Sequence, residues 1–158
     1  MALRPRILSA LLLAALAGGA SAGTVNVSYL APAEYTSLGS MSWDESMQRL
    51  GAHLQKLGNR LLPVDQVLTI EVLQLDLAGT VRGSQVRVLT GGADWPRMVV
   101  RYTLQAPGRP AITGEERVAD MNYLRGGMTA YGDSEPLFYE KRMLSRWFRE
   151  RFAATSPG

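Results

Sequence analysis

The sequence predicts an α+β domain, in which a mostly antiparallel sheet of four to five strands carries two amphipathic helices on one face. Two segments, residues 43–61 and 137–152, place apolar side chains at helical spacing. The segments before and between them show the two-residue alternation that is typical of half-buried strands. The predicted order is β-α-β-β-β-β-α, and one face of a sheet would cover the apolar stripe of each helix.

The N-terminal part of this domain predicts a strand, a loop and a helix. Residues 24–30 alternate apolar and polar side chains, as a half-buried strand does. A loop follows, after which Ser42 or Asp44 can cap a helix that ends before Pro63. The helix carries one apolar stripe, formed by Trp43, Met47, Leu50, Leu54, Leu57 and Leu61.

Four strands are expected in the middle of the chain. Residues 66–77 are rich in β-branched residues and leucine, and their apolar positions change phase after Val72, which indicates a bulge or a strand buried on both faces. A glycine-containing connection leads to a short strand at residues 86–89. Residues 97–105 and 111–118 then alternate and are expected to pair as a hairpin.

The last expected element is a helix that follows a loop over residues 120–133. Asp133 or Ser134 can cap it, and Pro136 is tolerated in its first turn. Residues 154–158 form a short polar tail. The apolar arc of the helix consists of Leu137, Leu144, Trp147, Phe148 and Phe152.

Residues 1–22 have the features of a cleaved secretory signal peptide. Arg4 and Arg6 make a basic start, an apolar run follows, and Ala20 and Ala22 supply the small side chains of a cleavage site. The apolar run is too short for a membrane span, which needs about 20 residues. We therefore expect a mature chain with a single domain over residues 23–153, located in the periplasm.

The charge and the cysteine content exclude several classes of protein. Of the 17 lysines and arginines, Arg4 and Arg6 leave with the signal peptide. The mature chain keeps 15 basic and 14 acidic residues, which gives a net charge of about +1. A nucleic-acid partner is not expected, because such binders show a strong basic excess. The chain has no cysteine, so we expect no disulfide, no thiolate metal site and no N-terminal lipid anchor. No further segment of the sequence predicts a transmembrane helix.

One carboxylate is unusual because it lies inside an apolar arc. The neighbours of Glu140 at helical spacing include Leu144 and Trp147. A buried, unpaired carboxylate is very costly, so a structural ion pair is expected. The candidate partners from the sheet are Arg97, Arg101 and Arg117. Two alternatives stay open, namely that Glu140 bends out to water or that it is a catalytic acid.

The expected binding surface combines the long loop with the last helix. The loop over residues 120–133 is long for a segment without secondary structure, which is typical of functional or disordered loops. Arginines on one helix face can bind an anionic ligand, an acidic partner or lipid headgroups, although a solvated helix face is the ordinary interpretation. The candidate binding residues are Asp120, Asn122, Tyr123, Arg142, Arg146 and Arg149.

The sequence favours a non-catalytic binding or envelope-accessory module over an enzyme. It contains no familiar catalytic or nucleotide-binding motif, and no cofactor or metal is expected. His53 has no carboxylate at helical spacing, so it is expected to be a partly exposed residue at a helix edge. The alternative is a small hydrolase that uses Glu116, Asp120 or Glu140 as acid or base. A third possibility is a protein that dimerises through a sheet edge.

The carboxylates at the end of the last strand are expected to be structural. Glu115 and Glu116 are adjacent on a strand and therefore point to opposite faces of the sheet. Glu115 is expected to join a ladder of opposite charges on the solvent face, because cross-strand ion pairs are modestly stabilising. The other members of this ladder would be Glu71, Arg101 and Arg117.

Four segments together resemble one known family. The chain is similar to an uncharacterised bacterial envelope family, the domain of unknown function 3016, over residues 24–152. The resemblance implies a small exported protein of Gram-negative bacteria. It implies no activity and no catalytic residues. The partner expected for a binding module, independently of the resemblance, is an unknown envelope protein or an anionic ligand. The segments are residues 64–72, 94–97, 114–123 and 139–148.

Overall fold

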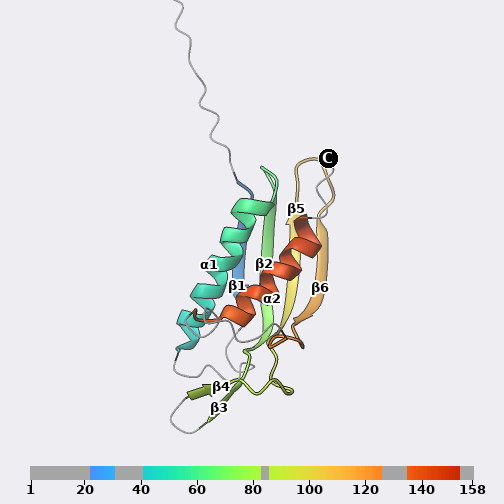
Figure 1. The fold of residues 1–158 in the computed structure, drawn as a ribbon. Helices are drawn as coiled ribbons and strands as arrows, with labels where there is room; N and C mark the ends of the chain where they lie inside the picture. The colour runs from blue at the N-terminus through green and yellow to red at the C-terminus, as the bar shows by residue number, and fades with distance from the viewer. Residues whose placement is uncertain (1–21, 31–40, 83–85, 126–134, 154–158) are drawn as a thin grey trace, which may run out of the picture.

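A computed structural model describes residues 22–30, 41–82, 86–125 and 135–153, and it confirms the α+β fold (Figure 1). Residues 1–21 of the expected signal peptide, Asp133, Ser134 and the expected tail lie outside these ranges. The elements are β1 (Thr24–Tyr29), α1 (Trp43–Leu61), β2 (Val67–Asp76), β3 (Thr80–Arg82), β4 (Val86–Val88), β5 (Arg97–Gln105), β6 (Ile112–Ala119) and α2 (Phe138–Phe148), which continues into a π-helical turn (Arg149–Ala153).

The main sheet has four strands in the order β1-β2-β5-β6. The β2–β5 and β5–β6 pairs are antiparallel, as expected, whereas β1 runs parallel to β2, so the sheet is mixed. The connection between β1 and β2 contains α1, whose 19 residues carry the chain back along the sheet. Such a helical crossover is what allows sequential strands to pair in parallel.

The middle of the chain differs from the expectation at one point. The segment expected to be only a connection contains β3, which pairs antiparallel with β4 to form a separate two-stranded sheet. A hairpin of this size is marginal alone and needs packing partners. It adjoins a small second core, in which Ala78, Tyr123 and Tyr139 are buried together.

Helices α1 and α2 cover the same face of the sheet (Figure 1). Ser42 caps α1 as expected, with its side chain accepting a hydrogen bond from the Glu45 N–H. Helix α2 begins later than expected, because Leu137 has a φ of 61° and cannot belong to a right-handed helix. The apolar stripe of α1 and the arc of α2 pack on the core side of the strands, around Leu68, Ile70, Val72, Val100 and Tyr102.

The phase change in β2 is a β-bulge, as one of the two interpretations predicted. The pairing register with β5 shifts between Val72 and Gln74. Leu75 therefore remains in the core, while Gln74 lies on the other face of the sheet. We call that other face the open face, because neither described helix packs on it. The side chains that β2, β5 and β6 place there are Thr69, Glu71, Gln74, Asp76, Arg97, Val99, Arg101, Thr103, Thr113, Glu115 and Arg117.

None of the helices in the described part of the chain is both long enough and apolar enough to cross a membrane.

Candidate functional site

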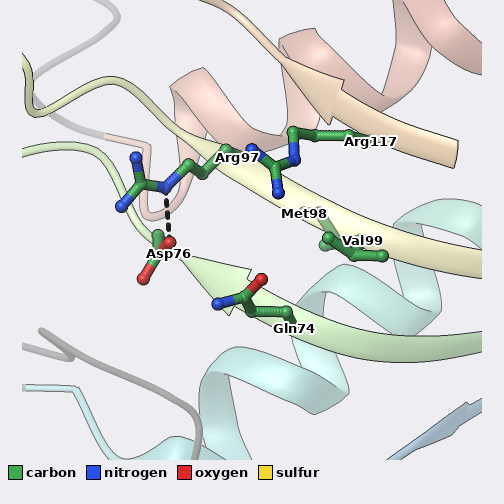
Figure 2. Close-up of a pocket in the computed structure, with 6 residues that line it drawn as sticks. All are labelled: Gln74, Asp76, Arg97, Met98, Val99 and Arg117. Atoms are coloured by element: carbon green, nitrogen blue, oxygen red, sulfur yellow. Dashed lines mark hydrogen bonds and ion pairs between the residues drawn. The ribbon is translucent and has the colours of Figure 1, made fainter.

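A hollow of about 240 Å³ lies on the open face, at the end of the sheet where the bulge occurs (Figure 2). It is formed by three neighbouring strands, β2, β5 and β6. The lining residues are Gln74, Asp76, Arg97, Met98, Val99 and Arg117. None of them was among the expected binding residues, so the hollow is a feature that the sequence interpretation missed.

The pairing register explains how these side chains meet. Gln74 and Arg117 are both partners of Val99, one on each side of it, so the three form one row across the sheet. In the next row Asp76 is the partner of Arg97. Figure 2 shows Arg117 reaching over β5, with the short side chain of Val99 between the longer ones. The phase change after Val72 was the only sequence signal for this arrangement.

The charges of the hollow are unbalanced. The Nε of Arg97 donates a hydrogen bond to Asp76 Oδ2 at 2.5 Å. Arg117 is exposed and makes no ion pair or hydrogen bond to any other residue that the structure describes. A free guanidinium presents paired N–H donors that match a carboxylate or phosphate group. The hollow is therefore suited to an oxyanion.

The expected charge ladder is present beside the hollow, but with one member fewer. Arg101 contacts Glu71 at 2.8 Å and Glu115 at 3.1 Å. These hydrogen bonds raise the pKa of Arg101, and the bond that Arg101 donates to Glu115 is the largest cause. Arg117 was expected in the same ladder, but within the described residues the two carboxylates bind Arg101 instead.

Three of the expected binding residues form a cluster around a buried carboxylate. Asp120 is only 4% exposed, and Arg142 donates to its Oδ2 at 3.0 Å. Arg146 lies 3.6 Å from its Oδ1 and donates to the Ala119 carbonyl at 3.2 Å. These contacts attach α2 to the end of β6, so Arg142 and Arg146 are not a freely solvated row.

Tyr123 is also a structural residue, whereas Asn122 is exposed. The Tyr123 hydroxyl donates to Asp94 Oδ1 at 2.9 Å and accepts the Gly91 N–H at 3.2 Å. Burial raises the pKa of Tyr123. Its ring contacts Tyr139 edge-on with centroids 5.1 Å apart, so the residue holds the segment before β5 against the start of α2.

Glu140 is completely buried, and its partner is Arg87 of β4. The same oxygen, Oε1, accepts the Ala78 N–H at 2.7 Å, while Oε2 has no hydrogen-bond partner. The three expected partners, Arg97, Arg101 and Arg117, lie on the open face, and the sheet separates them from α2. A buried ion pair thus joins α2 to the small β3–β4 sheet.

The carboxylates of the hydrolase alternative lie in three separate clusters. Glu116 accepts hydrogen bonds from Trp147 Nε1 at 2.9 Å and from the Tyr102 hydroxyl at 3.0 Å, and Arg151 lies 2.8 Å away. Asp120 and Glu140 bind other arginines. Each of the three carboxylates is therefore occupied by its own cationic partner.

His53 lies between α1 and α2 and is partly exposed, as expected. Its Nε2 is 3.1 Å from the Lys141 carbonyl oxygen and 2.8 Å from Ser145 Oγ. A protonated Nε2 would donate to the carbonyl, whereas an unprotonated Nε2 would accept from the Ser145 hydroxyl. Burial lowers the pKa of His53, so the ring favours its neutral form. Among the described residues, no carboxylate forms a hydrogen bond with the other ring nitrogen, Nδ1, so the third member of a Ser-His-Asp arrangement is not seen there.

Arg149, the last of the expected binding residues, is exposed and borders a shallow depression beside His53, Glu135 and Lys141. Lys141 is bound to Glu135 at 2.8 Å. This depression therefore has fewer free charges than its composition indicates. Within the described residues, no group of three side chains is arranged to hold a metal ion.

Comparison with known proteins places the chain in a family. No curated protein matches it. A family model described as "Protein of unknown function (DUF3016)" matches residues 23–150, which is most of the chain and includes every described strand and helix α2. This match confirms the resemblance carried by the four sequence segments, and the chain belongs to the DUF3016 family.

Proposed function

We propose that this protein is an exported, non-catalytic binding module of the bacterial envelope that holds an anionic ligand in the hollow of the open face. The observation that carries the proposal is Arg117, an arginine with no partner among the described residues, which lines the hollow with Arg97 and Gln74. Free guanidinium groups in a depression are the usual means of recognising carboxylates and phosphates.

The absence of a catalytic role is supported by how the acidic side chains are used. The hydrolase alternative would need two carboxylates in one cleft, with environments that separate their pKa values. Glu116, Asp120 and Glu140 each bind a different arginine and hold a different part of α2 in place. We propose that these carboxylates stabilise the fold and that the side chains available to bind a ligand lie on the open face.

Export is proposed from the first 22 residues. In a Gram-negative host, we expect to find the protein in the periplasmic fraction. Its measured mass should be that of a chain that begins at Gly23. An Ala22→Trp change should leave an uncleaved precursor, because the cleavage site requires a small side chain there. Ser21→Ala, at the tolerant middle position, is the matched control. Full-length protein that remains in the cytoplasm would contradict the proposed location.

The anion site is tested by replacing its unpaired cation. We expect Arg117→Gln to weaken binding of gluconate at least about tenfold, because charge-assisted hydrogen bonds contribute about 1.5–3 kcal/mol. Isothermal titration calorimetry at low salt measures the effect. Val99→Phe, which fills the hollow without changing the charge, should also weaken binding.

Arg60→Gln is the control for charge, because Arg60 lies in the last turn of α1, on the other side of the sheet. It removes the same charge and should leave the affinity within about twofold, since a charge farther away than the Debye length of about 8 Å is largely screened. Equal losses in Arg60→Gln and Arg117→Gln would show that net charge, and not the hollow, determines binding. The proposal would then be wrong.

A further inference from the structure

We infer that the hollow selects a ligand whose anionic group carries a single negative charge, namely a carboxylate or a phosphodiester, attached to a body that is uncharged nearby. This inference rests on the proposed function and specifies its ligand class. Phosphate monoesters and polyanions are expected to bind more weakly, because of the same charges that attract the single anion. Four features of the open face lead to this conclusion.

The first feature is the number of charges in the hollow. Arg97 and Arg117 are positive, and Asp76 is negative and bound to Arg97. Among these lining residues, one unit of positive charge is left. The attraction of a bound ion to this charge grows in proportion to the charge of the ion, whereas the cost of removing its water grows as the square of that charge. Doubling the charge of the ion therefore doubles the attraction but quadruples the desolvation cost, which favours a singly charged ion.

The second feature is the charge of the neighbouring row. Arg101 is flanked by Glu71 and Glu115, so this row carries a net negative charge. It lies two residues from Val99 along β5, which corresponds to about 7 Å. This distance is within the Debye length of about 8 Å at physiological salt. A ligand with a second anionic group in this direction would be repelled.

The third feature is the size of the hollow. Sites that enclose a whole small molecule usually have about 300–1,000 Å³, and this one has about 240 Å³. One anionic group fits, while the remainder of the ligand must lie outside it on the open face. That face has polar threonines, Thr69, Thr103 and Thr113, in the row beyond the negative one.

The fourth feature is the arrangement of donors. Arg117 and Gln74 stand on opposite sides of Val99, in one row. The guanidinium can donate two parallel hydrogen bonds to one oxyanion, and the amide can donate a third from the other side. Carboxylates and phosphodiesters both offer two oxygens that share one charge, so the geometry accepts either of them.

The test compares probes of similar size and different charge. At pH 8, dimethyl phosphate carries one negative charge and methyl phosphate carries close to two, because the second pKa of a phosphate monoester is about 6. We expect dimethyl phosphate to bind the purified protein at least threefold more tightly than methyl phosphate, and gluconate more tightly than citrate. Titrations followed through the arginine Nε resonances by NMR give the affinities and locate the site.

The decisive variant is Asp76→Asn, which removes the negative charge of the hollow. The preference should then invert, with methyl phosphate binding more tightly than dimethyl phosphate, because the hollow gains a second net positive charge. Glu45→Gln on α1 makes the same change in total charge, and its selectivity should be that of the unaltered protein. Arg117→Gln should weaken binding of every probe.

The outcomes separate this inference from the proposed function. If no probe shifts the Arg97 and Arg117 resonances, the hollow is not an anion site and the proposed function is wrong. If methyl phosphate binds the unaltered protein as tightly as dimethyl phosphate, and Arg117→Gln abolishes the binding of both probes, the hollow is an anion site but the inferred charge selectivity is wrong. Binding of dimethyl phosphate more tightly than methyl phosphate, or of gluconate more tightly than citrate, supports the inference. The tighter of the two singly charged probes then assigns the ligand: dimethyl phosphate indicates a phosphodiester, and gluconate indicates a carboxylate.

Discussion

Replacing Glu140 with glutamine is expected to lower the free energy of unfolding by about 3 kcal/mol, because removing one member of a buried ion pair costs about 3–5 kcal/mol. Glutamine keeps the shape of the side chain and an oxygen for the Ala78 N–H, but it removes the charge that binds Arg87. Urea denaturation measures the change. In a domain of this size the melting temperature should fall by roughly 10 °C.

A double-mutant cycle assigns this cost to the pair. Arg87→Met alone should be at least as destabilising as Glu140→Gln, because it leaves a 0% exposed carboxylate without a cation. The combination of both changes should cost less than the sum of the single changes by about 1–3 kcal/mol. Glu135→Gln is the control, since its ion pair with Lys141 is at the surface and is expected to contribute less than about 1 kcal/mol. Equal effects of Glu135→Gln and Glu140→Gln would contradict the buried pair.

The second large effect is expected at Gly114, where alanine should destabilise the protein by about 1–3 kcal/mol through overpacking. Gly114 is the cross-strand partner of Tyr102, and the phenol ring lies over it. A β-carbon at Gly114 would be 2.5 Å from the ring carbon Cζ. The ring has no room to withdraw, because Tyr102 is buried and its hydroxyl is held by Glu116 and Arg151. Thermal unfolding followed by circular dichroism measures the loss.

Two comparisons test whether the ring is the cause. Gly51→Ala in α1 meets only the Tyr29 hydroxyl at 3.4 Å and replaces a helical glycine, so it should be neutral or slightly stabilising. In a Tyr102→Val background the ring is absent, and Gly114→Ala should then cost little. An unchanged cost in that background would place the strain in the backbone of β6 and would refute the explanation.

The periodic parts of the sequence predicted the structure well. The alternation over residues 97–105 corresponds to β5 residue for residue, and Ser42 caps α1 as expected. These features depend on neighbours along the chain, where helical or strand periodicity determines which side chains share a face. The parallel pairing of β1 could not be read in this way, because it depends on where α1 returns the chain.

The candidate sites show the same division between local and distant information. The arc of α2 indicated that Glu140 is buried, but its partner Arg87 lies 53 residues away, in a hairpin whose first strand was not expected. The arginines of α2 were interpreted from helical spacing alone. Spacing does not show that Asp120 is buried at the end of β6, within reach of Arg142 and Arg146. The hollow requires three strands in register, which no single segment can display.

The polar contacts of α2 have a consequence for motion. An apolar stripe alone would allow a helix to rotate slightly or to slide along a sheet. Helix α2 and its π-helical turn are instead held at Glu140, at Arg142 and Arg146, and at Trp147, by partners on different elements. Rotation about the helix axis and translation along it would each break several of these contacts at once. Helix α2 therefore has one position on the sheet, and the strands beneath it keep a fixed spacing. An anion bound at the open face, as we propose, would meet strands that keep their positions, and only exposed side chains such as Arg117 would have to adjust to it.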